Sequence, residues 1–444
     1  MKISIICSCL THGGAEHCAV MWANGLTKQG HKVMVVTNLF EPITFQLNNE
    51  IELFDLVKYN KNKWQKWASS IQCVRHAIKQ FCPDVVIGVM PTCSFIAKAA
   101  VIGLHVPVVA TEHNSFERPQ SAPFPFIEKF AKYILNYLYD GVTVLTEADN
   151  KIIYGRFKNS KVMPNPLSLI PVRDTFNKTN VVIAAGRLDA WHYKGFDVLI
   201  RAWGQIIRKK TIDNGRLIMD NEQFDVQSLK LTEWKLQIAG TGSEASLQYL
   251  KQLCKENGVE NSVDFLGFVS DMESLYKRAS VFALSSRYEG FGLVLIEAMS
   301  QGCACVACDY KGRQREIICP GGVNDSFKFQ DSSSNTSSFK NQKSKVLECG
   351  AIDTCNLKPE THLQPEANLQ PETTPLRGVE VCENGILCEP DNVEALASAL
   401  EKMIDDDAYR ESVRTHAIER SKYYDMEHTM KRWEEYLNTI VNIK

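Results

Sequence analysis

The sequence lacks a long hydrophobic run, a strong net charge and a zinc-like spacing of cysteines. No apolar stretch reaches the roughly 18 residues that a membrane-spanning helix needs. The 50 basic and 52 acidic side chains leave a formal charge of −2, so no general attraction to nucleic acid is expected. No two CxxC pairs occur at the spacing of a zinc site, so we expect no bound metal.

Cysteine itself is abundant, with 15 residues in the chain. Several of them lie within apolar runs, as at 303–308, where a thiol acts as a small hydrophobic side chain. The apolar run at residues 3–7 is too short for a signal peptide and is expected to form the first strand. We therefore expect reduced cysteines and a cytoplasmic protein.

Short β-branched runs alternate with amphipathic helical patterns along most of the chain. Continuous apolar strands separated by helices are typical of parallel sheets with helices on both faces. There are too many such runs for one sheet, and the Pro-containing segment 163–166 with the polar stretch 173–180 marks a break. The pattern predicts an α/β protein with two Rossmann-like domains. Strands are expected at 2–7, 31–38, 85–90, 106–111, 141–146, 181–185, 234–239, 263–266, 281–285 and 303–308.

Two stretches interrupt this alternation. Residues 211–232 are polar and are expected to form a surface insertion between a helix and a strand. Residues 321–377 are rich in Ser, Asn and Lys and then repeat a six-residue unit from Lys358 onward. Such a low-complexity segment buries too little apolar surface to offset the entropy of ordering, so a loose outward loop without a catalytic role is expected.

The run 286–299 carries the strongest functional signal. Glu289 and Glu297 lie eight residues apart and flank the turn Gly290-Phe291-Gly292 and the apolar start of a helix. Glycines let backbone N–H groups approach a ligand, and a helix N-terminus favours an anion. The segment thus offers an anion cradle and two acceptors for hydroxyl groups, which suits a phosphorylated sugar. The alternative is a core helix with glutamates on its solvated face.

A glycine pair, Gly13 and Gly14, follows the first predicted strand. Its backbone can approach a phosphate or a sugar, or it can simply form a tight turn before a helix. The G-x-G-x-x-G fingerprint is absent, and the second strand ends at Asn38 rather than at an acidic residue. Both features argue against a dinucleotide-dependent dehydrogenase.

Cations and a histidine follow other predicted strands. Arg187 and Lys194 lie in one loop without sequence-local partners and would suit a diphosphate, although a pair of surface cations is the alternative. His113 follows a strand at the edge where parallel sheets bind ligands, and its alternative is a structural histidine. Gly240 and Phe268 also follow strands and are weaker signals.

In this order along the chain, the segments resemble the retaining glycosyltransferases of family 4, which have the GT-B fold. The resemblance covers nearly the whole chain apart from the two insertions. It implies two Rossmann-like domains whose parallel sheets face each other across a deep cleft. The matching positions are 13–16, 113, 186–188, 194–195, 240–242, 289–297, 313–318 and 384–387.

The resemblance also implies how the chain divides. Residues 1–165 would form the acceptor-binding domain and residues 166–407 the nucleotide-sugar-binding domain, which would carry both insertions. Residues 408–444 would be helices that pack back towards the N-terminal domain. This chain departs from the family in the long insertion between Ile318 and Asn384.

The resemblance implies a role for each matched residue. Arg187 and Lys194 would bind the donor diphosphate and stabilise the leaving group, and Glu289 would contact the donor sugar. With His113 near the reaction centre, these four are the implied catalytic residues. Glu297 would accept hydrogen bonds from the ribose hydroxyl groups. The implied donor-binding residues are Gly13, Gly14, Gly240, Phe268, Phe291, Gly292, Leu293 and Glu297.

Members of this family retain the anomeric configuration, and the nucleotide phosphate helps to deprotonate the acceptor. Cationic side chains take the place of a metal, so the resemblance implies no metal and no cofactor besides the nucleotide-sugar donor, which is a co-substrate. The implied reaction moves a hexosyl or N-acetylhexosaminyl group from a UDP-sugar to a saccharide or lipid-linked acceptor in cell-surface polysaccharide or lipopolysaccharide biosynthesis. Two alternatives stay open: a GT-B sugar synthase on a soluble acceptor, and a non-catalytic nucleotide-sugar-binding protein.

Two segments of the first domain combine cations with aromatic residues, at 58–67 and 124–139. Such segments can contact a membrane surface or a lipid-linked acceptor, and the alternative is a solvated basic loop beside a packed helix. The sequence therefore predicts, at most, a peripheral contact with the inner face of the membrane.

Overall fold

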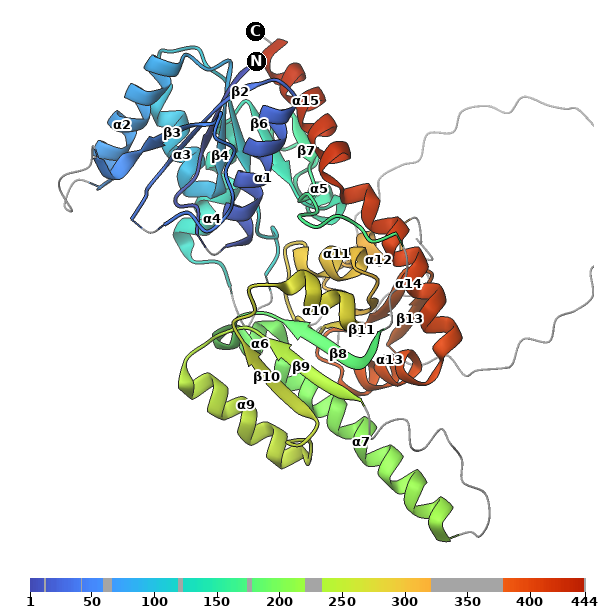
Figure 1. Cartoon of the computed structure of the whole chain (residues 1–444). Helices are drawn as coiled ribbons and strands as arrows, with labels where there is room; N and C mark the ends of the chain where they lie inside the picture. Colours follow the sequence, from blue (N-terminus) through green and yellow to red (C-terminus); the bar gives the residue numbers. More distant parts are fainter. Residues whose placement is uncertain are drawn as a thin grey trace, which may run out of the picture.

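The structure, a computed structural model, describes residues 1–11, 13–40, 42–58, 66–118, 123–173, 178–219, 234–320 and 378–442. These residues form two α/β units, each built on its own sheet (Figure 1). We call the sheet of residues 2–162 with its helices the N-terminal domain, and the sheet of residues 179–388 with its helices the C-terminal domain.

The N-terminal domain has a seven-stranded sheet in the order β3-β2-β1-β4-β5-β6-β7, and all its pairs are parallel. The strands are β1 Lys2–Ile6, β2 Lys32–Thr37, β3 Glu52–Asp55, β4 Val85–Val89, β5 Val108–Thr111, β6 Gly141–Val144 and β7 Ser160–Val162. The helices are α1 Gly14–Lys28, α2 Lys66–Phe81, α3 Met90–Ala100, α4 Phe126–Tyr133 and α5 Glu147–Ile153, with short 3₁₀ turns η1 Leu56–Lys58 and η3 Leu135–Leu138.

The C-terminal domain has a second seven-stranded sheet, in the order β10-β9-β8-β11-β12-β14-β13. Its pairs are parallel except that the edge strand β13 runs antiparallel to β14. The strands are β8 Thr179–Ala185, β9 Lys235–Ala239, β10 Val263–Gly267, β11 Ala279–Leu284, β12 Ala304–Cys308, β13 Val379–Cys382 and β14 Gly385–Cys388. The helices are α6 Trp191–Lys194, α7 Phe196–Met219, α9 Glu244–Asn257, α10 Met272–Arg278, α11 Leu293–Ser300, α12 Arg315–Ile318, α13 Val393–Asp405, α14 Asp407–Ser421 and α15 Met426–Asn442.

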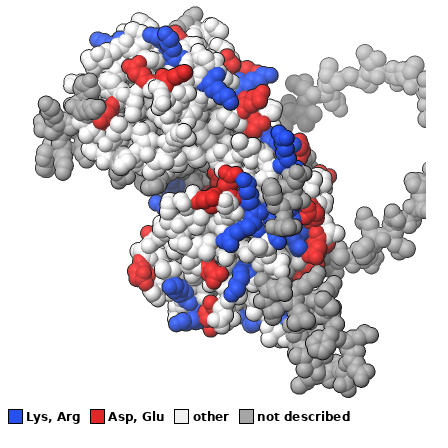
Figure 2. All heavy atoms as spheres, viewed as in Figure 1, with Lys and Arg blue, Asp and Glu red and all other residues white. Residues whose placement is uncertain are grey.

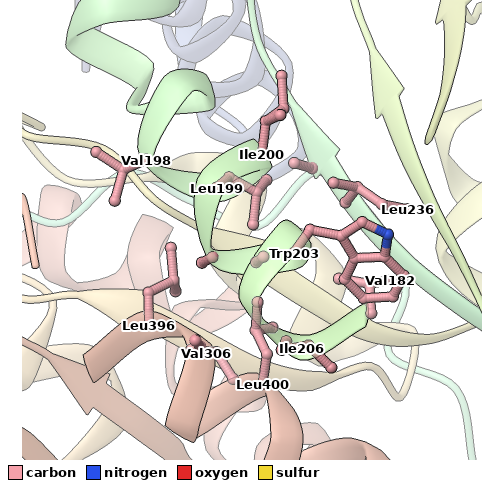
Figure 3. Close-up of a cluster of buried hydrophobic side chains, with 14 of the residues drawn as sticks. Val182, Val198, Leu199, Ile200, Trp203, Ile206, Leu236, Val306, Leu396 and Leu400 are labelled. Atoms are coloured by element: carbon pink, nitrogen blue, oxygen red, sulfur yellow. The ribbon is translucent and has the colours of Figure 1, made fainter. Parts of the chain in front are cut away.

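Both sheets are covered on both faces, which explains their continuous apolar strands. In β12, Val306 belongs to the core on one face and Cys305 to the core on the other. On the first of these faces, Trp203 of α7 is fully buried among Val182, Leu236 and Leu400 (Figure 3). Alternate residues of one strand thus support two separate cores, so every position of β12 is buried.

The ten strands expected from the sequence all form, with ends that differ by a few residues. Four short strands, β3, β7, β13 and β14, were not predicted from the sequence. Each has three or four residues, and β3, β7 and β13 include charged side chains, whereas β14 is buried throughout. The insertion expected at 211–232 begins as a continuation of α7, which runs to Met219. The rest of that insertion, the repeat-bearing insertion at 321–377 and most of the basic segment 58–67 lie outside the described residues.

The last helix, α15, returns to the N-terminal domain, where it lies beside α1 (Figure 1). Trp433 is fully buried there, with its ring 4.8 Å from that of Trp22. The hydroxyl of Tyr436 donates to the carbonyl of Asn159 at 2.7 Å. The boundaries expected at 165 and 407 stay predictions. No helix in the described parts of the chain is long and apolar enough to cross a membrane.

Buried charges join the two domains. The guanidinium of Arg313, which is fully buried, forms two hydrogen bonds with the carboxylate of Asp149, at 2.7 and 3.2 Å. The carboxylate of Glu316 accepts from the backbone N–H groups of Glu147 and Ala148, at 2.7 and 2.6 Å. These N–H groups open helix α5 and would otherwise lack a partner within the helix. The C-terminal domain therefore adds a carboxylate to the N-terminus of a helix that Thr146 of the N-terminal domain already caps.

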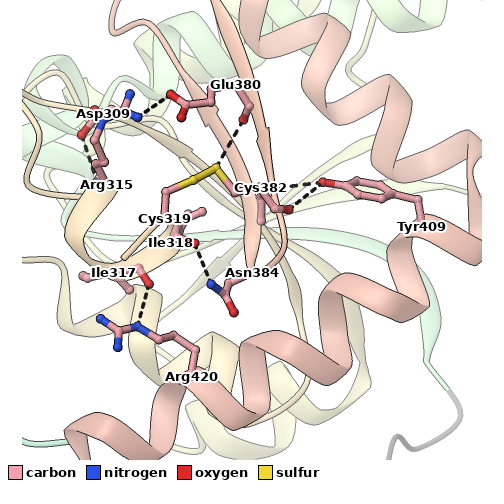
Figure 4. Close-up of a disulfide and its surroundings, with 11 residues drawn as sticks. Asp309, Arg315, Ile317, Ile318, Cys319, Glu380, Cys382, Asn384, Tyr409 and Arg420 are labelled. Atoms are coloured by element: carbon pink, nitrogen blue, oxygen red, sulfur yellow. Dashed lines mark hydrogen bonds and ion pairs between the residues drawn. A yellow bond between two sulfur atoms is a disulfide. The ribbon is translucent and has the colours of Figure 1, made fainter. Parts of the chain in front are cut away.

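The expectation that all cysteines are reduced is wrong for one pair. Cys319 and Cys382 form a disulfide across 63 residues (Figure 4). Both residues flank the insertion 321–377, and the disulfide joins the end of α12 to β13. The sequence reading missed it because the two cysteines are far apart in the chain. The two meet because β13 pairs with β14 next to α12. The described cysteines outside this pair are free.

We expect the disulfide to stabilise the C-terminal domain. Replacing Cys319 and Cys382 by serine should lower the free energy of unfolding by about 2–4 kcal/mol, because the unfolded chain regains the entropy of a long open loop. Chemical denaturation with and without a reductant measures this difference. The variant C73S/C82S, which changes two free cysteines, is the control. Equal stability of the double variant and the unmodified protein would contradict the expectation.

Candidate active site

The predicted loops of the C-terminal domain meet at one edge of its sheet, because carboxyl ends of parallel strands share an edge. Lys194, at the end of α6, forms an ion pair with Glu289, with Nζ 2.5 Å from Oε1. The hydroxyl of Ser286 donates to the same carboxylate oxygen at 2.8 Å. The side chains of Lys194 and Glu289 are 26% and 13% exposed, so the pair is partly open to solvent.

Glycines allow the loops of this edge to approach one another. Gly195 has φ +62°, and a Cβ there would lie 1.9 Å from the carbonyl oxygen of Ser285. A Cβ at Gly240 would lie equally close to the carbonyl oxygen of Gly186. The N–H of Gly240 donates to the carbonyl of Gly267 at 2.8 Å. The structure thus explains Gly240 by packing, and its predicted contact with a donor stays a prediction.

The turn 290–292 leads into helix α11, as expected. Gly292 has φ +97° and is the residue before the first turn of α11. Phe291 points into the core, and its ring lies 5.5 Å from that of Tyr424. Leu293 packs against the cores of both domains. The first N–H groups of α11 therefore begin at the boundary between the domains, where a helix N-terminus favours an anion.

Glu297 lies one turn further along α11. Its Oε1 accepts a hydrogen bond of 2.8 Å from the hydroxyl of Ser168, in the segment that joins the two domains. Burial raises the pKa of Glu297 above its ordinary value, and the hydrogen bond from Ser168 opposes that shift. The sequence reading did not identify Ser168, because no motif marks it.

The N-terminal domain contributes His113 from the end of β5. Its Nε2 lies 3.2 Å from the hydroxyl of Thr111, and its Nδ1 is buried without a partner among the described residues. Burial and the nearby ammonium of Lys132 lower the pKa of His113 from 6.5 to about 4. The ring is therefore neutral at neutral pH, with one nitrogen left to bond a ligand.

The two domains approach each other closely where His113 lies beside the loop that contains Glu289. A Cβ at Gly290 would lie 2.5 Å from the carbonyl oxygen of His113. Only a glycine leaves room for this contact, so the residue after Glu289 lies directly against the backbone of His113. The structure thus brings together Lys194, Glu289 and His113, which come from both domains.

A buried ion pair supports the chain next to His113. The ammonium of Lys132, on α4, lies 2.8 Å from Oε2 of Glu112 and donates to the carbonyl of Asn114 at 2.8 Å. Both side chains of the ion pair are at most 2% exposed. Asn136 donates to the other oxygen of Glu112 at 3.0 Å. The sequence reading missed Lys132, because a lysine on an amphipathic helix is ordinarily exposed.

The glycine turn of the first domain faces the second domain. A Cβ at Gly14, the first residue of α1, would lie 3.5 Å from a methyl carbon of Leu293. Gly13 lies under the carboxylate of Glu16, which occupies the space where a side chain would begin. Gly14 is thus near the start of α11, and its predicted contact with a donor stays a prediction.

Two predicted residues lie further out. Arg187 is exposed and forms no ion pair at short distance with the described residues, although its charge acts on the carboxylate of Asp189. Phe268 follows β10 and is 69% exposed. On the face shown in Figure 2, the surface is hollowed between the two domains, and basic and acidic side chains are interspersed on both.

Possible metal ligands gather at one place in the described parts of the chain, around Cys319, Glu380 and Cys382. Both sulfur atoms form the disulfide, and Glu380 lies 2.5 Å from a guanidinium nitrogen of Arg315 (Figure 4). This group therefore does not offer thiolate ligands. The chemistry of the site as described is that of cations, carboxylates, a neutral histidine and a helix N-terminus, which together suit an anionic sugar derivative.

Two family models match the chain. Residues 12–171 match the family model described as "Glycosyltransferase Family 4", and residues 169–349 match "Glycosyl transferases group 1". A Campylobacter jejuni α-1,4-N-acetyl-D-galactosaminyltransferase, which its name assigns to an undecaprenol-diphosphate-linked acceptor, is 29% identical over 72% of this chain and 82% of its own.

Two solved structures share the fold. Sucrose-phosphate synthase from Thermosynechococcus elongatus has a TM-score of 0.69 at 14% identity, with all of both chains covered. Anabaena HepE, solved in complex with UDP, has a TM-score of 0.64 at 17% identity, covering 99% of this chain and 100% of that one. The similarity extends over both domains.

The low pKa of His113 predicts how stability depends on pH. Between about pH 6.5 and 4 the unfolded chain binds a proton at this residue that the folded chain does not. The free energy of unfolding should therefore fall as the pH drops through this range, by up to about 3 kcal/mol from His113. The variant H113Q should show a smaller fall, as measured by denaturation at several pH values. H416Q, which changes an exposed histidine on α14, should behave like the unmodified protein. The prediction is refuted if the free energy of unfolding of H113Q depends on pH as strongly as that of the unmodified protein.

Proposed function

We propose a reaction for this chain, which belongs to the family 4 (group 1) glycosyltransferases with the GT-B fold. The chain transfers a sugar from a UDP-sugar to a saccharide or lipid-linked acceptor. The reaction would retain the anomeric configuration, need no metal and transfer a hexosyl or N-acetylhexosaminyl group. It would take place in the cytoplasm, at the inner face of the membrane, in cell-surface polysaccharide or lipopolysaccharide assembly.

The observation that best supports this proposal is the Lys194–Glu289 ion pair, with His113 beside it across the domain boundary. Arg187 and Lys194 would bind the donor diphosphate, and a diphosphate would compete with Glu289 for the ammonium of Lys194. The carboxylate of Glu289 would then be free to accept hydrogen bonds from the donor sugar. The Nδ1 of His113, for which the described part of the chain offers no partner, would bond the same sugar from the other domain.

In the proposed reaction, the bond between the anomeric carbon and the diphosphate oxygen breaks, and the electron pair leaves with the diphosphate. Arg187, Lys194 and the N-terminus of α11 stabilise its charge. The acceptor hydroxyl oxygen bonds to the same face of the anomeric carbon, and its proton passes to a phosphate oxygen. Glu297 would hold the ribose hydroxyl groups of the nucleotide, and Phe268 and the backbone at 291–293 would complete the donor site.

Two other functions would use the same fold. The similarity to a sucrose-phosphate synthase favours a synthase acting on a soluble sugar acceptor as the second candidate. Assays that offer one UDP-sugar with lipid-linked and with free-sugar acceptors separate these two enzymes. The third candidate, a non-catalytic nucleotide-sugar-binding protein, requires that no acceptor supports turnover.

A lipid-linked acceptor agrees with an apolar surface on the N-terminal domain, formed by α4 and η3. Its exposed side chains follow a helical spacing along one face, and two of them are more than 80% exposed. Lys129 is exposed among them, while the nearby carboxylate of Glu128 is paired with Arg118 at 2.9 Å. Apolar side chains with an exposed cation suit the surface of an anionic bilayer. We call this the α4 surface; its members are Phe126, Ile127, Phe130, Ile134, Tyr137 and Leu138.

The proposed reaction can be tested by substitutions in the donor site. We expect K194A and E297A each to lower transfer by about 100-fold or more, because each removes a group that binds the donor in the transition state. The measurement is release of nucleoside diphosphate with a UDP-sugar and an acceptor. K277A and E273A are matched controls, because Lys277 and Glu273 form an ion pair of the same 2.5 Å length on α10. Normal transfer by both K194A and E297A would refute the proposal.

The α4 surface can be tested by sedimentation with phosphatidylglycerol-containing vesicles at low salt. We expect F126S/I127S to bind at least about tenfold more weakly than the unmodified protein, since two large apolar side chains no longer enter the bilayer. I170S, which changes an equally exposed residue in the segment between the domains, is the control. Absence of vesicle binding by the unmodified protein, or equal weakening by I170S, would rule out this surface as the membrane contact.

A further inference from the structure

Arg287 lies in the functional loop between β11 and α11, two residues before Glu289, yet it plays no part in the reaction described above. Its guanidinium binds two carboxylates. With Asp197 the two hydrogen bonds measure 2.6 and 2.8 Å, and with Asp391 the Nε bond measures 2.9 Å. It also donates to the carbonyl of His192 at 2.6 Å. The side chain is 13% exposed.

These partners come from three separate segments. His192 belongs to α6, which ends at Lys194, and Asp197 lies in the first turn of α7. Asp391, with φ +63°, comes just before α13. The backbone of Arg287 adds a fourth link, because its N–H donates to the carbonyl of Tyr193 at 2.9 Å. Arg287 therefore ties the loop of Glu289 to the short helix that carries Lys194.

We propose that Arg287 is a positioning residue, which holds Lys194 and Glu289 at the separation that the nucleoside diphosphate requires. The proposal rests on the proposed function, in which Lys194 binds the diphosphate. One residue lies between His192, whose carbonyl Arg287 binds, and Lys194. One residue also lies between Arg287 and Glu289. A shift of the guanidinium would thus move both partners of the ion pair relative to each other.

The planar guanidinium is required by this geometry. Its parallel N–H groups bind both oxygens of Asp197, and a lysine has a single ammonium that cannot form the same pair of bonds. Loss of the guanidinium also leaves Asp197, whose side chain is 6% exposed, with a much weaker partner in Arg201 at 3.5 Å. A substitution at Arg287 will therefore lower stability as well, so the test needs a measurement that stability alone does not change.

A double-mutant cycle supplies that measurement. The variants R287M, K194M and R287M/K194M are compared with the unmodified protein by titration calorimetry. The probe is whichever of UDP and GDP the unmodified protein binds more tightly, and thermal unfolding confirms that each variant is folded at the titration temperature. We expect R287M to weaken binding about tenfold or more, and the double variant to bind like K194M alone, because Arg287 acts through Lys194.

Two further variants sharpen the result. R287K should recover part of the thermal stability but less of the affinity, since it restores the charge without the paired hydrogen bonds. R410M is the matched control: Arg410 is also 13% exposed and binds a carboxylate and two carbonyls, but it joins α13 to α14. It should lower stability and leave affinity unchanged.

The possible failures are distinguishable. If K194M weakens binding but R287M does not, or if the two effects add fully in the double variant, Arg287 has only a structural role and the positioning proposal is overturned. If K194M binds the nucleotide like the unmodified protein, the role of Lys194 in the proposed function fails together with the positioning proposal.

Discussion

The buried ion pair of Arg313 with Asp149 is the interaction on which the arrangement of the whole molecule depends. It joins two domains that have separate sheets and separate cores, and both side chains are almost completely buried. A buried charge without an opposite charge beside it destabilises the fold. The pair therefore favours the relative orientation of the domains in which the two side chains meet. Glu316 adds a second polar contact close by, through the N-terminus of α5. The carboxylate of Asp149 also accepts from the N–H of Phe116 at 2.7 Å, so the same contact orders the chain after His113.

The candidate active site follows from that orientation, since its residues come from both domains. Gly290 lies against the carbonyl of His113, and Leu293 contributes to both cores. The site of the C-terminal domain contains an ion pair, Lys194 with Glu289. A pair of this kind needs no further counterion, and an anionic ligand can replace the carboxylate as the partner of the ammonium. The exposed Arg187 adds a second cation, whose charge acts on the carboxylate of Asp189.

Helix α4 of the N-terminal domain contributes to two parts of the structure. Helix α4 carries exposed apolar residues on one face, while its Lys132 reaches inward to Glu112, next to His113. A single short helix thus contributes both to the outer surface and to the support of the site. The carboxyl-terminal helix α15 covers α1 of the same domain, so the two ends of the chain help to build one core.

Much of the fold could be predicted from the sequence, because a parallel strand that is buried on both faces must be apolar throughout. Strands such as β4 and β12 have this property and were found. The edge strands β3 and β13 were not, because an edge strand has few residues and tolerates charged ones. For the candidate site, local motifs were enough to select Lys194, Glu289, His113 and Glu297 as candidate residues.

The residues that contact these side chains could not be predicted, because contacts depend on distance in space and not on distance along the chain. Ser168 lies 129 residues from Glu297, and Cys319 lies 63 residues from Cys382. A lysine on an amphipathic helix is ordinarily exposed, but the fold buries Lys132 beside Glu112. The sequence by itself determined the two parallel sheets, the glycine turns and the kinds of side chain at the strand ends, since these follow from local periodicity and backbone freedom. Only the tertiary structure decided which charges are paired, which cysteines are joined and which glycine touches His113, because those contacts arise when separate strands and domains pack together.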